Sequence, residues 1–335
     1  MKSKILKSVF LILCITISVS LVYAWGRWGH KHISRGAVFA LPQPMQIFYY
    51  NHIDFITESA VIPDLRRALI NDRNEPPRHF IDVENFKTAV SDLPTDPKQA
   101  FKKYDSSFLN RNGYLPWYIE ELTDKLTAAF KRRDKSEILF LSSELSHYIA
   151  DAHMPLHTSA NYNGQFTGQN GVHSLWESAL PETFGSTFHF KTPQAVYIKD
   201  IPGKTFEMIA QSHSLVDILL SKEKEVRSRF TKENMYKKDS AGKVIMFYNS
   251  PVFSYEYQKE FNQALGGMVE HQLQLSIYDV ASYWYTAWVN GGRPNLTSMD
   301  DPHLTKQNKK NYKKELEAWK KGKLLNLSND QKEVK

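Results

Sequence analysis

The chain has very little cysteine and few stretches that alternate apolar and polar residues as strands do. Its one cysteine, Cys14, lies near the N-terminus. One thiol cannot form a disulfide within the chain or build a cysteine cluster around zinc, which excludes disulfide-stapled small folds and cysteine-rich zinc modules. The 335 residues suffice to bury a proper core, and bound metal could act as the staple that disulfides do not provide.

Residues 1–24 have the features of a secretory signal peptide. MKSKILK is a basic start, VFLILCITISVSLV is an apolar centre, and Val22-Tyr23-Ala24 places small residues at a cleavage site. We expect cleavage after Ala24 and a secreted or periplasmic protein. An uncleaved membrane anchor is the alternative, but the apolar run barely reaches the length that spans a membrane.

The net charge of +7 is unevenly distributed along the sequence. The signal peptide holds three lysines, and residues 306–323 hold eight lysines and two glutamates, which leaves the body of the chain near −2. A basic tail is not a basic groove, so the charge gives little support for nucleic-acid binding.

Apolar spacing predicts an all-α protein with a single multi-helix domain. That domain is expected to span residues 25–293, followed by a polar, Lys-rich tail over residues 294–335 that holds one short helix at the periphery. Residues 160–171 are rich in Asn and Gly and predict a loop, and 244–248 is the one candidate strand. Helices are predicted over residues 33–41, 44–58, 115–132, 135–151, 172–180, 206–229 and 261–289, the last bent at Gly266-Gly267 and ended by Gly291-Gly292.

The stretch HYIADAHMPLH is the strongest sign of a metal site. His147 and Asp151 are four residues apart and therefore share a helix face, and His173 and Glu177 repeat this spacing after the loop. His157 follows the break expected at Pro155. Imidazole and carboxylate ligands suit Zn²⁺. A single pair of this kind more often marks a His–carboxylate hydrogen bond on a helix surface, but two pairs with an intervening histidine favour metal.

Two further groups of candidate ligands lie upstream, and each is weak alone. Asp64 follows a proline and could cap a helix, and His79 could be a core histidine. After cleavage, Trp25 would carry a free α-amino group, which could chelate metal together with its own carbonyl and with His30.

Together these residues resemble the zinc-dependent phospholipase C and single-strand nuclease superfamily, with its phospholipase branch the closer. The resemblance covers residues 25–180 and implies an all-helical enzyme with three zinc ions. Asp64, His79, His147 and Asp151 would hold the first ion, and His157, His173 and Glu177 the second. The third would take the Trp25 amine and carbonyl with His30, and would share Asp151. His153 has no counterpart in this pattern, and Asp82 is expected to orient a ligand imidazole. The nine matching positions are Trp25, His30, Asp64, His79, His147, Asp151, His157, His173 and Glu177.

The resemblance implies hydrolysis of a phosphodiester by zinc-bound hydroxide that attacks phosphorus, with Asp64 orienting or deprotonating the nucleophile. Arg66 or Arg67 could clamp a phosphate oxygen, although surface ion pairs are their commoner role. Phe80 could stack a base, although such a residue is more often core.

The sequence is compatible with three functions. Glu177 and the short interval before His173 favour a phospholipase C. Such an enzyme is expected to act on phospholipid or another phosphodiester, as a monomer with transient contact to a membrane surface. The spacing of Trp25 and His30 favours the alternative, a nuclease or nucleotidase acting on nucleic acid. The third is a non-catalytic binding module stabilised by zinc.

Overall fold

The computed structural model describes residues 26–247, 250–299, 306–325 and 327. The expected signal peptide and Trp25 lie outside the described residues. Within the described part the fold is all-α, as the sequence predicts, apart from one antiparallel pairing of β1 (Met246–Phe247) with β2 (Ser250–Pro251). No helix in that part is long and apolar enough to cross a membrane.

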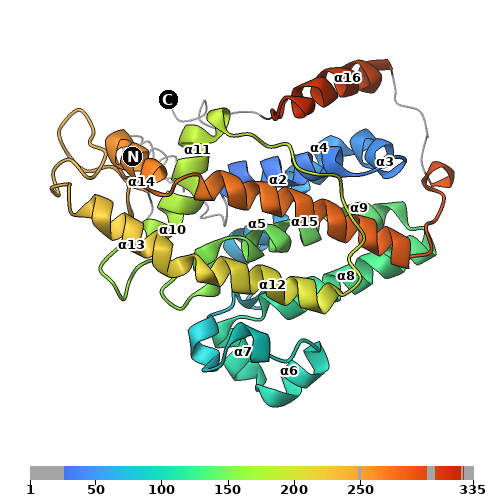
Figure 1. Ribbon diagram of the computed structural model, residues 1–335, viewed down its shortest axis with the longest axis horizontal. Coiled ribbons are helices and arrows are strands. Elements are labelled where there is room, and N and C mark those ends of the chain that lie inside the picture. The colour runs from blue at the N-terminus through green and yellow to red at the C-terminus, as the bar shows by residue number, and fades with distance from the viewer. Residues whose placement is uncertain (1–25, 248–249, 300–305, 326, 328–335) are drawn as a thin grey trace, which may run out of the picture.

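Four helices form the centre of the molecule: α2 (Gly26–Ala40), α8 (Leu115–Arg132), α9 (Lys135–Ala152) and α15 (Met268–Asn290). α8 lies beside α9, and α15 packs against both and against α2 (Figure 1). The other helices surround these four: α3 (Met45–Asn51), α4 (Ile53–Ser59), α5 (Ile62–Leu65), α6 (Pro97–Lys103), α7 (Ser106–Asn112), α10 (Val172–Ser174), α11 (Leu180–Phe184), α12 (Ile201–Ser214), α13 (Val216–Arg227), α14 (Tyr255–Ala264) and α16 (Lys306–Lys320).

Local chemistry explains the boundaries of the central helices. The Asp134 side chain accepts a hydrogen bond from the Glu137 backbone N–H at 3.0 Å and so caps α9 at its N-terminus. α9 ends at Ala152, and Pro155 opens a separate 3₁₀ turn, η5 (Pro155–Thr158), as expected from the ring's clash with a continuing helix. α2 approaches α15 closely because residue 36 is glycine: a Cβ there would lie 2.8 Å from Cδ1 of Ile277.

Several predicted helices are divided or shifted. The 44–58 segment breaks at His52 into α3 and α4, and the 206–229 segment begins at Ile201 and breaks at Leu215 into α12 and α13. The 261–289 segment bends where expected, because Gly266 and Gly267 take φ of 59° and 87° and separate α14 from α15. α2 begins seven residues earlier than the predicted 33–41 helix, and the sequence missed α6 and α7.

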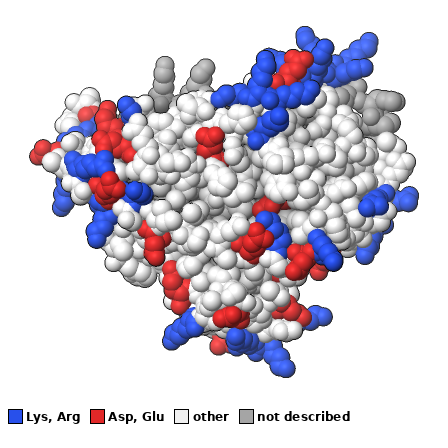
Figure 2. All heavy atoms as spheres, viewed as in Figure 1, with Lys and Arg blue, Asp and Glu red and all other residues white. Residues whose placement is uncertain are grey.

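The helix of the C-terminal tail is docked on the body and not merely solvated. α16 packs against α2, where Glu315 reaches Arg35 at 2.6 Å, with both side chains only 2% exposed. Trp319 is buried and its ring lies 5.9 Å from that of Phe39. The lysines stay outside: Figure 2 shows basic side chains gathered over α16 and no continuous basic surface across the face in view.

Candidate metal centre

Helices α2 and α9 and the 3₁₀ turn η5 carry the first of the predicted ligands. α9 presents His147 and Asp151 on successive turns of one face, so both side chains point to the same place. His30 comes from the neighbouring α2, and η5 carries His157. All four side chains are almost fully buried.

Irregular helical segments carry the remaining described ligands. Asp64 lies on the short α5, directly before the π-helical turn η1 (Arg66–Ile70), and His79 follows the 3₁₀ turn η2 (Pro76–Arg78). His173 is in α10, while Glu177 lies in the π-helical turn η6 (Leu175–Ala179) in place of a continuous α-helix. Their i,i+4 spacing still brings the two side chains together, with 3.2 Å between Nε2 of His173 and Oε1 of Glu177.

The first group joins Asp64, His79 and His147, whose ligand atoms lie within 4.8 Å of one another. Nδ1 of His79 is 3.1 Å from Nε2 of His147. Both nitrogens lie near Oδ2 of Asp151, at 2.9 and 3.4 Å. Oδ1 of Asp64 completes the set at 3.9 Å from Nδ1 of His79.

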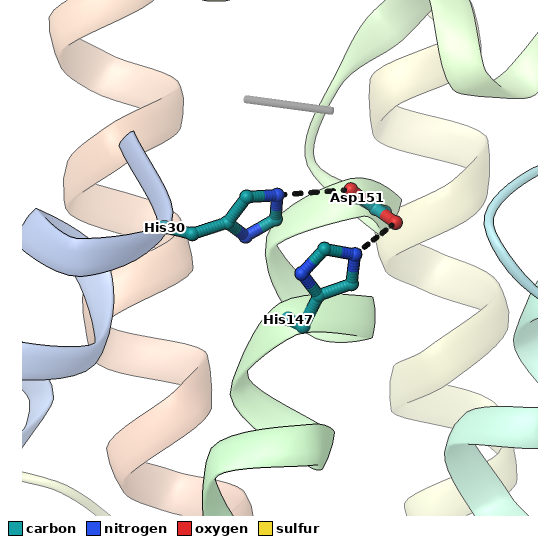
Figure 3. Close-up of side chains that lie close together, drawn as sticks. All are labelled: His30, His147 and Asp151. Atoms are coloured by element: carbon teal, nitrogen blue, oxygen red, sulfur yellow. Dashed lines mark ion pairs between the residues drawn. The ribbon is translucent and has the colours of Figure 1, made fainter. Parts of the chain in front are cut away.

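The second group joins His30, His147 and Asp151, and it shares His147 with the first (Figure 3). Nε2 of His30 is 3.6 Å from Oδ1 of Asp151. The His30 and His147 rings stack with centroids 3.8 Å apart. Asp151, on α9, therefore turns Oδ1 toward His30 of α2 and Oδ2 toward His147.

The third group joins His157, His173 and Glu177. The fully buried Glu177 carboxylate faces both imidazoles, with Oε2 at 3.5 Å from Nε2 of His157 and Oε1 at 3.2 Å from Nε2 of His173. Nδ1 of His157 also lies 3.7 Å from Oδ1 of Asp151, which connects this group to the other two.

Backbone carbonyls orient three of the histidines. Nδ1 of His147 donates to the carbonyl of Ala60 at 2.8 Å, Nδ1 of His157 to that of His79 at 2.7 Å, and Nδ1 of His173 to that of Tyr162 at 3.0 Å. In each case the bond fixes the tautomer and leaves Nε2 facing its group, which is the usual outer arrangement around a metal-ligating imidazole.

His79 is oriented by Glu75, a residue that the sequence analysis missed. Nε2 of His79 pairs with Oε1 of Glu75 at 3.2 Å, so Nδ1 faces the metal group. Asp82, which we expected in the orienting role, does not take it, because its segment pairs instead with α7 through the Asn112 carbonyl. The i,i+4 spacing of Glu75 and His79 was the available signal.

A buried network holds Glu75 in turn. The Arg66 guanidinium binds Oε2 of Glu75 at 3.0 Å and both oxygens of Glu144 at 2.8 and 2.6 Å, and Tyr148 donates its hydroxyl to Glu75. The Arg66 guanidinium is therefore already paired with carboxylates of the protein. Arg67 lies 3.3 Å from Oδ1 of Asp64 and is partly exposed, so it is the better placed of the two arginines to meet a phosphate.

The buried polar atoms of the ligand groups fit zinc as a partner. Both nitrogens of His30, both oxygens of Asp64 and Oδ1 of Asp151 are buried without a hydrogen-bond partner among the described residues. Buried polar atoms are almost always satisfied, so five such atoms on three residues of the ligand groups need an explanation. Zn²⁺ accepts nitrogen and oxygen ligands of these types and would satisfy them.

Electrostatics among the protein groups alone favours the charged form of two of the carboxylates, Asp151 and Glu177. Burial would raise the pKa of Asp151, but the His147 and His157 imidazoles hold it well below its usual range. Burial opposes ionisation of Glu177 as well, yet His173 and His157 lower its pKa to about 2. Burial lowers the pKa of His30 well below 6.5, which keeps its nitrogens free of a second proton and open to a metal.

A family model described as zinc-dependent phospholipase C matches residues 29–241. The chain belongs to this family. The match spans every described ligand residue, and membership supports a phosphodiesterase-like hydrolase that uses zinc. No curated protein matches the chain.

The other residues named in the sequence analysis are Trp25, His153 and Phe80. Trp25 lies outside the described residues. His153, which has no counterpart in the family pattern, is in none of the three groups and pairs with the buried Asp279 of α15 at 3.0 Å. Phe80 is half-buried, and its backbone carbonyl accepts from the Leu115 N–H at 3.2 Å.

Proposed function

We propose that this zinc-dependent phospholipase C family member is a secreted phosphodiesterase that acts on phospholipid at a membrane surface. The observation that carries hydrolysis is the set of three contiguous groups of buried ligands, joined by the single carboxylate of Asp151. Bound zinc would supply Lewis-acid chemistry, acidifying water and neutralising the charge that develops at phosphorus.

Side chains of the protein would have the other roles in hydrolysis. Burial raises the pKa of Asp64, which suits this carboxylate to accept a proton from the attacking water. Arg67, beside Asp64 at 3.3 Å, would contact a phosphoryl oxygen through its guanidinium. The Glu75–Arg66–Glu144 network would keep His79 fixed while the substrate binds and leaves.

An apolar rim beside the ligands favours lipid over nucleic acid. It consists of Leu69 and Ile70, 58% and 73% exposed, and Tyr162 and Phe166, 52% and 74% exposed. The first pair lies on the turn η1, next to Asp64, and the second lies in the loop that leads to His173.

Two contacts support a rim beside the metal ligands. The Tyr162 ring centroid is 6.0 Å from that of His173, and Arg67, on the same turn as Leu69 and Ile70, is 3.3 Å from Oδ1 of Asp64. The loop 160–171 carries no charged side chain. Exposed aromatic and aliphatic side chains without charge suit the interface of a bilayer better than a polyanion.

A direct comparison of substrates tests this proposal. Zinc-loaded protein beginning at Trp25 is incubated with mixed phospholipid vesicles and with single-stranded DNA, each with a chelated control. We expect chelator-sensitive release of diacylglycerol. Release of nucleotides in its place would make the protein a nuclease, and zinc binding without either product would favour a non-catalytic module.

The rim is tested separately. Ile70→Ser with Phe166→Ser removes two apolar anchors, and burying one such side chain is worth about 1.5–3 kcal/mol, so vesicle binding should weaken at least about tenfold. Hydrolysis of a short-chain, monomeric phospholipid should keep its rate. Phe101→Ser, an exposed aromatic on α6, is the matched control and should change neither value.

A further inference from the structure

Among the five histidines of the three groups, His30 is held differently from the rest. The other four each have a hydrogen bond or ion pair from the ring nitrogen that faces away from the group. Neither nitrogen of His30 has a hydrogen-bond partner among the described residues. Its ring stacks on His147 and faces Oδ1 of Asp151 at 3.6 Å, and both of these residues belong to its own group.

α2 packs mainly against α15, α4 and α9, and α16 adds a buried contact to it. Arg35, five residues after His30, donates to Oε2 of Glu315 at 2.6 Å, and Tyr50 of α3 donates to Oε1 of the same carboxylate at 2.9 Å. Glu315 therefore ties α2 and α3 to α16. Farther along, the Trp319 ring stacks on Phe39 near the end of α2.

The ion pair between Arg35 and Glu315 is buried. Arg35 and Glu315 are each 2% exposed, and the other acidic partner of Arg35, Asp54, is 3.6 Å away and 91% exposed. Removing Glu315 would leave a buried guanidinium without its main counter-charge, which strongly destabilises the local structure. The destabilised helix is α2, which also carries His30.

We propose that α16 is a clasp that positions His30, with Glu315 as the positioning residue, so that the metal affinity of the His30 group depends on a helix outside the family match. The proposal rests on the zinc binding proposed above. The effect is specific to one group because the other histidines have orienting contacts of their own. α16, at residues 306–320, lies beyond the matched residues 29–241.

The test compares zinc release from full-length variants as chelator concentration rises. His30→Ala identifies the release step that belongs to the His30 group. In Glu315→Ala we expect that same step at about tenfold lower chelator concentration, the scale seen when an outer-shell partner is lost, with the other steps unchanged. Glu317→Ala, an exposed glutamate on the same helix, is the matched control and should match the wild-type protein.

A substitution that only destabilises the fold should give a different pattern of zinc release. Leu126→Ala opens a cavity in the buried face of α8, and it should lower Tm without selecting the His30 step. Should Glu315→Ala not fold, Trp319→Leu loosens the clasp without leaving an unpaired charge and should shift the step in the same direction.

Wild-type release of zinc from Glu315→Ala and Trp319→Leu would overturn the clasp. The same selective loss in Leu126→Ala would overturn it too. A wild-type protein that binds no zinc would refute the proposed function itself.

Discussion

Replacing Asp151 with asparagine gives the sharpest test of how the three groups are connected. The buried carboxylate turns Oδ1 toward His30 at 3.6 Å and His157 at 3.7 Å, and Oδ2 toward His79 at 2.9 Å and His147 at 3.4 Å. Asparagine keeps the shape of the side chain and removes its charge. Two ions should therefore lose a ligand at once, one at the Asp64–His79–His147 group and one at the His30 group.

The size of the effect follows from the burial. Removing one partner of a buried, paired charge costs about 3–5 kcal/mol, and about 1.4 kcal/mol is a factor of ten in affinity, so each of the two ions should bind about 10²- to 10⁴-fold more weakly. The third group holds its own carboxylate, Glu177, and should keep its ion.

Zinc per protein, measured by atomic-emission spectrometry after dialysis against a chelator, reports the result. Asp279→Asn is the matched control, since this aspartate is equally buried and also faces a histidine, His153, but belongs to none of the groups. Loss of only one ion from Asp151→Asn would show that the Asp151 carboxylate is not shared by two ions.

Three further substitutions probe other parts of the molecule. Glu75→Gln should weaken zinc binding at the His79 group about 10- to 100-fold in a chelator competition, because it removes the charge that holds the imidazole; an unchanged affinity would contradict this role. Glu177→Asp should lower the ratio of lipid to nucleotide hydrolysis, and a constant ratio would remove the main sequence argument for lipid. Burial raises the pKa of Glu120 from 4.5 to about 8, so folding keeps a proton that the unfolded chain releases and stability falls as pH rises through that window. Glu120→Gln should therefore raise Tm more at pH of about 8 than at about 5, and a gain independent of pH would show that this carboxyl does not titrate as described.

The regular helices were predictable because their apolar spacing and their end signals agree. The predicted 115–132 helix is α8, and α9 extends the predicted 135–151 helix by one residue. The pairs at i and i+4 followed from geometry alone. They survive even at His173 and Glu177, where the helix has a π-helical turn, because a π turn also returns side chains four to five residues apart to one side.

Other features depend on contacts that no local pattern encodes. The breaks at His52 and Leu215 contain neither glycine nor proline. Helical spacing puts Glu315 on the same face as Tyr312 and Trp319, but no local pattern identifies the buried Arg35 as its partner. Arg66 and Arg67 are adjacent in sequence, and only the fold shows that one is enclosed by acids while the other meets Asp64.

The carbonyl groups that orient the histidines have a consequence for how the protein is made. The acceptor for His147 lies 87 residues away in sequence, and the acceptor for His157 lies 78 residues away. A chain that has formed α9 but not yet docked the segments around Ala60 and His79 therefore presents loosely held imidazoles and binds zinc weakly. Tight binding begins only when distant parts of the chain have met, and it then stabilises that arrangement over every incomplete one. We therefore expect that fully folded chains retain the metal and that incompletely folded chains lose it.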